Sequence, residues 1–468
     1  MMGKSYRGDS LFYTFRLDDY VPKNHLLRVI HEYVDLSFVR ERLASSYSHT
    51  GRPSIDPEIL LRILLIGYFY GITSERRLVE EIGMPLAYRW FTGLDFNQTI
   101  PDHSTFSKNR HKRFKESGIF RDLFDEIVQR CIQEGLVDGR EVSVDGTRIM
   151  ADASPYSRIP REQLPEAAKV FKSVQQYLAD LEKENPVNEN QSPDKDEPPD
   201  SSGDAPPKKK ESATVSTTDP DAGWSVKNRQ ALLGYLSNYL MDNKSRVILG
   251  VEATPAMFSQ EVSAAQHLLE QARAKGLHPK SLGADKAYGN GEFLNWLLKR
   301  KIAPHIPVIE HGDHPNNKGF FPKELFEYDK EKDAFRCPNA QWLLRRGISR
   351  AGKITSYTAS PRQCRVCPFK PRCTRAQARK ISVHWYEDAR NAARALVGTP
   401  SYNRSRHYRK QIEGLFGELK NIIRLKRVRL RRLWNVAEQF YLAAAVQNIK
   451  RLTKFLIQRE ATFITGTA

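Results

Sequence analysis

Long apolar runs are missing from this sequence, and their absence argues against a membrane protein. No run reaches the roughly 18–20 residues that cross a bilayer. Residues 59–70 form an apolar stretch, but it is too short and it contains Arg62. The first residues, Met-Met-Gly-Lys-Ser-Tyr-Arg-Gly-Asp, lack the apolar core of a secretory signal. We therefore expect no membrane partner and no export, and a location in the cytoplasm.

Acidic residues are scarce relative to basic ones. The 468 residues include 55 Asp and Glu against 74 Lys and Arg, so the net charge is +19 and the pI is about 9.6. The imbalance is concentrated from Ser401 to the end, where 15 basic residues meet 4 acidic ones, a net of +11. Such a surplus favours a polyanionic partner, with nucleic acid the leading candidate. A surface that merely aids solubility is the alternative.

Cysteine is also scarce, with five in the chain. Without an export signal, so few thiols indicate a reducing compartment and no disulfide framework. Cys131 lies among apolar residues and is predicted to be in the core. The other four gather in a proline-rich basic stretch: Cys337, Cys364, Cys367 and Cys373. A Cys-x2-Cys pair with two further thiolates suits a tetrahedral structural Zn²⁺ site.

The cysteine cluster allows other interpretations. The four residues could be free thiols, or His305, His311 and His314 could supply ligands, although their loop shows no pairing pattern. The cluster lies between positions 285 and 413, a separation far greater than one crossover needs. Residues 320–380 are therefore predicted to form an inserted subdomain that a metal ion stabilises.

The hydrophobic period changes along the chain and predicts its domains. Residues 1–138 read as helices, including 56–70, 74–82, 101–114 and 118–134, either a DNA-binding module or a plain bundle. From 139 to 468, strands and helices alternate as in a mixed α/β sheet, with a hairpin around Asp242. Within this part, 185–222 is predicted to be a disordered insertion and 401–468 to form basic helices.

A cationic helix is predicted around the sequence Arg409-x3-Glu413-x6-Lys420. At about 3.6 residues per turn, one stripe combines a single carboxylate with cations and one aromatic ring: Arg409, Glu413, Phe416, Lys420 and Arg427. The opposite side is apolar: Ile412, Leu415, Leu419 and Ile422. A metal ligand beside DNA phosphates would need this arrangement, while a solvated basic helix with an ion pair is the alternative.

Two further carboxylates stand where strands end. Asp145 lies in an alternating strand before Gly146, and Asp285 follows the short strand 281–284. Carboxylates at strand ends face the crevice where α/β sheets bind ligands. Two-metal phosphoryl transfer needs a few convergent carboxylates, whose hard oxygens suit Mg²⁺ or Mn²⁺.

These pieces, taken in order, resemble the DDE transposases of bacterial insertion sequences. The matching segments are Val-Asp-Gly-Thr-Arg-Ile around Asp145, Ala-Asp-Lys-Ala-Tyr around Asp285, and Arg409-x3-Glu413-x6-Lys420. The helical part through Pro101-Asp-His-Ser-Thr-Phe also looks like that group's N-terminal domain. One departure is Arg406, which stands where the longer family signature has tyrosine.

The resemblance implies an RNase H-like catalytic domain after the helical DNA-binding domain. It implies that Asp145, Asp285 and Glu413 hold two Mg²⁺ or Mn²⁺ ions. Donor-phosphate contacts are predicted for a set of cations on and after the helix: Arg409, Lys420, Arg424, Lys426, Arg427 and Arg429. Rival carboxylates are Glu418, nearer the apolar edge of the helix, and Asp152; Asp242 is expected to be a turn residue.

The predicted function is transposition. The protein would bind the terminal inverted repeats of its element, act as an endonuclease at each end, and join the freed 3′-OH to target DNA by direct transesterification. The expected partners are double-stranded DNA and a second copy in a synaptic homodimer, in the bacterial cytoplasm near the nucleoid. The alternatives are an RNase H-like nuclease or resolvase without strand transfer, and a non-catalytic zinc-bearing DNA-binding protein.

Overall fold

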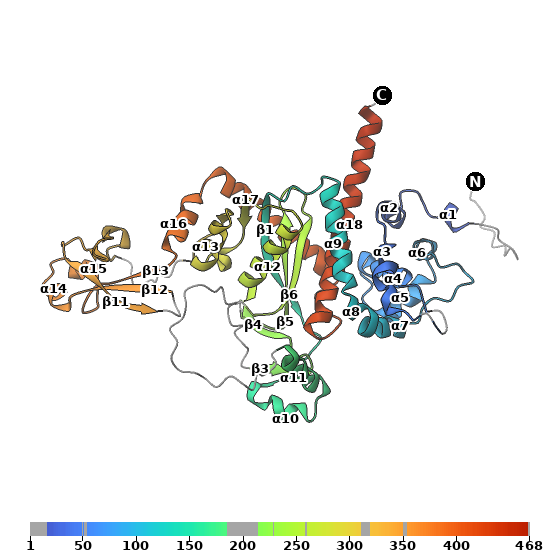
Figure 1. The fold of residues 1–468 in the computed structure, drawn as a ribbon, viewed down its shortest axis with the longest axis horizontal. Coiled ribbons are helices and arrows are strands. Elements are labelled where there is room, and N and C mark those ends of the chain that lie inside the picture. The colour runs from blue at the N-terminus through green and yellow to red at the C-terminus, as the bar shows by residue number, and fades with distance from the viewer. Residues whose placement is uncertain are drawn as a thin grey trace, which may run out of the picture. The chain divides into compact units, whose positions relative to one another are not determined.

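The computed structural model describes residues 16–48, 50, 54–184, 214–227, 229–257, 260–309, 319–349 and 353–466. The chain divides into two compact units, both of which contain helices and strands (Figure 1). The larger unit comprises Met1–Gly139, Val144–His278 and Lys410–Ala468, and the smaller comprises Arg140–Ser143 and Pro279–Arg409. Strand β1 and helix α17 each run from one unit into the other.

The first part of the larger unit is helical, as the sequence predicts. Its helices are α1 (Leu17–Tyr20), α2 (Leu26–Tyr33), α3 (Phe38–Leu43), α4 (Pro57–Tyr70), α5 (Glu75–Ile82), α6 (Leu86–Thr92), α7 (His103–Asn109), the π-helical turn η2 (Arg110–Phe114), α8 (Lys115–Ser117) and α9 (Ile119–Gln133). The predicted caps are present, because the Asp56 carboxylate accepts the Glu58 N–H at 2.9 Å and the Ser74 hydroxyl accepts the Arg77 N–H at 3.3 Å. Local signals were sufficient here.

Helix α4 is buried along almost its whole length, which explains its apolar sequence. Its basic residue, Arg62, pairs with Glu58 at 2.7 Å and donates to the Phe91 carbonyl at 3.1 Å. A buried charge needs such partners, since breaking a buried pair typically costs about 3–5 kcal/mol. On α9, Cys131 is fully buried as predicted, and burial raises the pKa of its thiol to about 12.

A six-stranded sheet has the strand order β4-β5-β1-β7-β8, with β6 beside β5. The strands are β1 (Glu141–Met150), β4 (Gly223–Lys227), β5 (Gln230–Asp242), β6 (Ile248–Pro255), β7 (Ser281–Gly283) and β8 (Ala303–His305). Strands β4, β5 and β6 pair antiparallel, whereas β1, β7 and β8 pair parallel. Helix α12 (Glu261–Ala274) packs on β5 and β6. The predicted mixed fold with a helical N-terminal region is confirmed.

Asp242 has the turn role expected of it. Its carboxylate accepts the Ser245 N–H and hydroxyl at 2.8 and 2.7 Å, and the Gly139 N–H at 2.8 Å. These bonds hold the β5–β6 hairpin and occupy both carboxylate oxygens.

The predicted disordered insertion is partly wrong. Residues 185–213 lie outside the described residues, but 214–222 are ordered, and β3 (Thr214–Ser216) pairs with β2 (Arg158–Pro160). Ser216 is fully buried and bonds the Ser157 hydroxyl at 2.7 Å. The segment before the insertion forms two helices, α10 (Leu164–Ala168) and α11 (Lys172–Glu184). Buried hydrogen bonds order this segment despite its polar composition.

The C-terminal stretch departs from the helical stripe that the sequence predicts from Arg409 to Arg427. Helix α17 (Pro400–Gly417) passes into a π-helical turn, η9 (Glu418–Ile422), and residues 423–432 are not helical. A π turn adds a residue to the turn and shifts the helical phase. Consequently Ile422 is 55% exposed, although the sequence predicts that it lies in the core. Arg427 lies beyond the helix, where its backbone forms an isolated β-bridge with Met150. Helix α18 (Leu433–Gly466) then packs against α9 and β6.

Phe416 also departs from the predicted stripe. It is buried at 8% exposure and its ring lies 5.1 Å from that of Tyr239 on β5. The stripe of exposed residues on α17 is therefore narrower than the sequence predicts.

The smaller unit contains a second, five-stranded antiparallel sheet in the order β13-β12-β11-β10-β9. Its elements are α13 (Gly291–Lys299), β9 (Glu327–Asp329), β10 (Ala334–Arg336), β11 (Trp342–Ser349), β12 (Ile354–Ala359), α14 (Pro361–Arg365), α15 (Lys370–Cys373), β13 (Lys380–His384) and α16 (Glu387–Leu396). One face of this sheet has its own core, with Phe335, Leu343 and Tyr357 at its centre. Across the described ranges, no helix is both long and apolar enough to cross a membrane.

Candidate active site

Asp145 lies in β1 beside a close contact between strands. Strand alternation buries Val144 completely and leaves Asp145 half-buried on the other side. The Asp145 Oδ1 accepts the N–H of Gly146 at 2.8 Å. A Cβ at Gly146 would lie 2.7 Å from Asn238 Oδ1, so the packing here favours glycine after the carboxylate.

Asp285 stands just beyond the end of β7. Its Oδ1 accepts the Ala287 N–H at 2.8 Å and caps the short turn η6 (Lys286–Tyr288). In the parallel β1–β7 pair, Ser143 is opposite Gly283. Asp145 and Asp285 each come two residues after this pair along the chain, Asp145 within β1 and Asp285 beyond the end of β7.

Glu413 and its rival Glu418 have very different surroundings. Glu413 is exposed on α17 and makes no ion pair with another described residue. Glu418 accepts bonds from Arg451 at 3.1 Å and Gln447 at 3.2 Å, and lies 3.5 Å from Lys450. Burial alone would raise the pKa of Glu418, but Arg451 and these neighbours lower it. Glu418 therefore anchors α18, whereas Glu413 is accessible to a ligand.

Lys420 lines a cavity of about 380 Å³. Gly146, the residue after Asp145, lines the same cavity. Arg148 and Glu261 also line it. Burial, followed by the nearby Arg148 and Lys426 charges, lowers the pKa of Lys420. Two cations held close together in a partly enclosed space attract an anion, although Glu261 adds one negative charge to the same lining.

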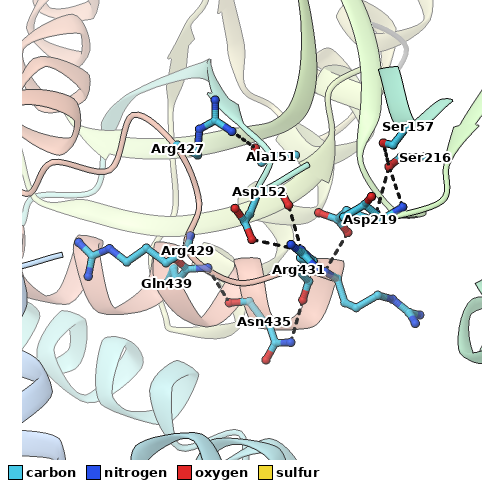
Figure 2. Close-up of polar contacts among 12 residues, drawn as sticks. Ala151, Asp152, Ser157, Ser216, Asp219, Arg427, Arg429, Arg431, Asn435 and Gln439 are labelled. Atoms are coloured by element: carbon cyan, nitrogen blue, oxygen red, sulfur yellow. Dashed lines mark hydrogen bonds and ion pairs between the residues drawn. The ribbon is translucent and has the colours of Figure 1, made fainter. Parts of the chain in front are cut away.

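Several arginines of the predicted DNA-binding stretch are used within the protein, as Figure 2 shows. Arg427 Nη1 donates to the Ala151 carbonyl at 3.3 Å. Arg429 Nη2 donates to the Ile423 carbonyl at 3.3 Å, and its guanidinium lies 5.0 Å from the Tyr68 ring centroid. Lys426 is exposed, and Arg409 is half-buried with an interaction of its own.

The sequence analysis missed the role of the last two arginines in this stretch. Arg431 Nε donates to Asp152 at 3.1 Å, which gives that rival carboxylate a structural partner (Figure 2). Arg432 pairs with Asp180 and Asp221, both at 2.8 Å. These acids lie more than 200 positions earlier in the chain, so no local sequence signal could have revealed the pairs.

The backbone of Arg432 adds one more contact in this network. Its N–H donates to Asp219 Oδ1 at 3.0 Å, and the Tyr235 hydroxyl donates to the same oxygen at 2.8 Å. Burial still dominates and raises the pKa of Asp219 to about 6.

Two family models match the chain. One describes a transposase domain (DUF772) and covers residues 15–112, and the other describes a transposase DDE domain and covers residues 336–453. The chain therefore contains one region that matches a transposase domain and one that matches a transposase DDE domain. Among solved structures, it is similar to a piggyBac transposase synaptic complex with hairpin DNA, at 8% identity and a TM-score of 0.36, over 93% of this chain and 75% of that one. Comparison with curated proteins gives no match.

The predicted recognition of a DDE transposase is thus confirmed. The DDE match contains Glu413 and Lys420, while Asp145 and Asp285 lie between the two matches. DDE transposases generally use divalent metal ions. Within the ranges that the structure describes, no group of three or more His, Cys, Asp or Glu is placed to bind a metal ion.

The four clustered cysteines of this transposase lie inside the DDE match and form no disulfide. Cys337, Cys364 and Cys373 pack against the core of the smaller sheet. Burial raises the pKa of the Cys373 thiol; Arg379 opposes this, and the neighbouring thiols of Cys364, Cys337 and Cys367 raise it further. The thiols are therefore close neighbours, but the structure gives the zinc prediction no direct support.

The histidine alternative fares no better. His305 is buried, its Nδ1 lies 2.6 Å from the Ser405 hydroxyl, and burial lowers its pKa. His305 therefore has a hydrogen-bond partner in Ser405. His311 and His314 lie outside the described residues.

Proposed function

We propose that this DDE transposase binds the terminal inverted repeats of its own insertion sequence and catalyses both phosphodiester hydrolysis and strand transfer. The observation that carries the proposal is the register of β1 and β7. Its last pair is Ser143 with Gly283, and Asp145 and Asp285 each come two residues after that pair along the chain, while Glu413 lies within the DDE match; these facts support the proposal.

Asp145, Asp285 and Glu413 are the proposed ligands of Mg²⁺ or Mn²⁺. The donor set fits such hard cations because all three are carboxylates, Asp145 and Asp285 are only half-buried, and Glu413 is exposed. When bound, the ions would favour ionisation of the attacking water and neutralise charge on the phosphate. We infer that the catalytic domain is RNase H-like.

Neither hydrolysis nor strand transfer needs a covalent bond between the enzyme and DNA. In hydrolysis, a water oxygen bonds to phosphorus and the 3′ oxygen leaves as the hydroxyl that ends the element. In strand transfer, that 3′ oxygen attacks a target phosphodiester and displaces the target's own 3′ oxygen. Lys420 and Arg148, which border the cavity beside Gly146, would hold the phosphate during both steps.

The remaining parts of the chain receive roles by their position. Residues 1–138 would recognise the repeat, and residues 139–468 would form the catalytic part. Exposed Lys426 and Arg424, with Arg409, would contact donor phosphates. Because an element has two ends, the working form would be a homodimer on DNA.

The test is an assay of the purified chain on duplex DNA that carries the element's terminal repeat. We expect cleavage and strand-transfer products with Mg²⁺ or Mn²⁺ and none with EDTA. Cleavage without any joined product would identify a nuclease or resolvase instead. Binding without cleavage under any metal condition would identify a non-catalytic DNA-binding protein and contradict the proposal.

We also propose a structural Zn²⁺ bound by Cys337, Cys364, Cys367 and Cys373, since unpaired thiols gather at the edge of one small core. Elemental analysis of the purified protein should find about one zinc per chain. The variant Cys364→Ser should lose that zinc, whereas Cys131→Ser on buried α9 should retain it. Protein without zinc, whose four clustered thiols alkylate freely, would contradict this assignment.

A further inference from the structure

The smaller unit carries a charge pattern that the proposed catalytic site does not use. Between positions 334 and 386 the sequence contains 12 Lys and Arg and not one Asp or Glu. Ordinary protein surfaces intersperse both signs. A stretch of this length with cations alone is typical of a surface that meets a polyanion, while a solvated cationic face is the alternative.

Five of these cations lie on a short segment around the Cys-x2-Cys pair, residues 361–375, here called the knuckle. They are Arg362, Arg365, Lys370, Arg372 and Arg375. The segment contains α14 and α15, and Cys364 and Cys373 on its inner side pack against the sheet core. Because the cysteines face inward, four of the five cations are exposed and Lys370 is half-buried.

The knuckle cations lack acidic partners among the described residues. Elsewhere in the same unit such partners exist: Arg345 pairs with Asp333 at 3.1 Å, and Lys353 pairs with Glu292. Arg372 lies instead over the Phe321 ring at 5.5 Å. The positive charges of the knuckle are thus held on a folded surface without an ion pair to any acid that the structure describes.

Apolar side chains are interleaved with these cations. Val366 is 81% exposed and Phe369 is 41% exposed, both between Arg365 and Lys370. An isolated apolar residue on a surface needs no explanation, but two within a cationic turn add contact area for sugars or bases. The combination of phosphate-binding charge and exposed apolar groups fits a nucleic acid better than a small anion.

We propose that the knuckle is a second DNA-contact surface, which grips duplex phosphates without reading their sequence. This inference rests on the proposed function only in choosing DNA among polyanions. Its basis is the folded cationic surface, so it holds whether or not the cysteines carry zinc. Contacts of this kind would add affinity for flanking or target DNA equally at any sequence.

The test compares two variants of the full chain that lose the same charge from the same unit. One is Arg362→Gln with Arg365→Gln in the knuckle. The control is Lys299→Gln with Lys330→Gln, which are exposed on α13 and beside β9. Binding of a random-sequence duplex is measured by fluorescence anisotropy over a range of KCl, without Mg²⁺ and without chelator, and thermal unfolding confirms that both variants fold.

The knuckle variant should bind roughly tenfold more weakly at low salt, and its plot of log K against log[KCl] should be flatter by roughly two units of slope. The control should keep the wild-type slope. Equal behaviour of the two variants would overturn the proposal, as would a loss seen with single-stranded RNA and absent with duplex DNA. Since no cleavage is involved, an inactive protein would defeat the proposed function and leave this result standing.

Discussion

Two stretches of this protein have similar densities of positive charge and opposite surroundings. Residues 424–432 contain six Lys and Arg, and the knuckle, residues 361–375, contains five. In the first stretch Arg431 and Arg432 pair with aspartates, and Arg427 and Arg429 donate to carbonyls. In the knuckle no described acid is paired with a cation. Basic sequence alone therefore does not distinguish a structural arginine from one that is available to a ligand.

The difference has a physical cause. The loop 423–432 crosses from α17 to α18 over β1 and the β2–β3 region, and its backbone must be held there by side chains. The knuckle packs against the core of the smaller sheet through Cys364 and Cys373, and its cations form no ion pair with a described acid. The arginines of the loop 423–432 therefore stabilise the fold, whereas the cations of the knuckle are available to bind a ligand.

The largest stability effect is expected at Arg432. Replacing it with alanine leaves Asp221 and Asp180 without a cation in a partly buried site, so Arg432→Ala should lower the free energy of unfolding by about 3 kcal/mol. Urea unfolding monitored by circular dichroism measures this. The matched change in the knuckle, Arg365→Ala, should stay within about 0.5 kcal/mol of wild type. Similar losses in both variants would erase the contrast between the two stretches.

The next effect concerns pH and a carboxyl group of the larger unit. Glu438 on α18 is partly shielded, with Arg110 at 3.8 Å, and burial raises its pKa to about 7. Because this folded-state pKa is above the unfolded value, the folded state binds more protons, and stability falls as pH rises from about 4.5 to about 7. Glu438→Gln should therefore raise the free energy of unfolding by about 1–2 kcal/mol at pH 8 and leave it unchanged at pH 4.

Urea titrations of wild type and Glu438→Gln at the two pH values provide the measurement. The knuckle variant Arg362→Gln with Arg365→Gln serves as control, and its pH profile should follow wild type because neither arginine is paired with an acid in the described part of the chain. A gain by Glu438→Gln that is equal at both pH values would show that packing, and not ionisation, causes it.

The smallest effects are expected within the loop 423–432, where they distinguish a cation that stabilises the fold from one that contacts DNA. Arg429→Gln loses its position over Tyr68 and should cost about 1 kcal/mol of stability. Lys426→Gln should leave stability unchanged and flatten the salt dependence of DNA binding by roughly one unit. Thermal unfolding and anisotropy titrations of the two variants test this, and the reverse assignment of effects would show that Arg429 is the ligand-facing residue.

How far the sequence predicts this molecule depends on how local the signals are. Helix α4 follows from the Asp56 cap and the apolar run, and Asp285 comes after the short strand β7, as predicted. Asp145 does not stand at a strand end as the sequence predicts, because it lies in the middle of the ten-residue strand β1. The order of residues 214–222 could not be predicted, because it depends on Arg432, far away in the chain. The π turn after Gly417 likewise has no local sequence signal, so the sequence predicts an exposed stripe that extends further along the chain than the observed one.

The most direct test of the account compares Glu413→Gln with Glu418→Gln on terminal-repeat DNA with Mg²⁺. Glu413 is exposed and is the proposed metal ligand, while Glu418 anchors α18 through Arg451. We predict that Glu413→Gln slows cleavage by roughly a thousandfold or more with DNA affinity unchanged, and that Glu418→Gln still cuts. Wild-type cutting by Glu413→Gln beside an inactive but folded Glu418→Gln would contradict the assignment of the third carboxylate.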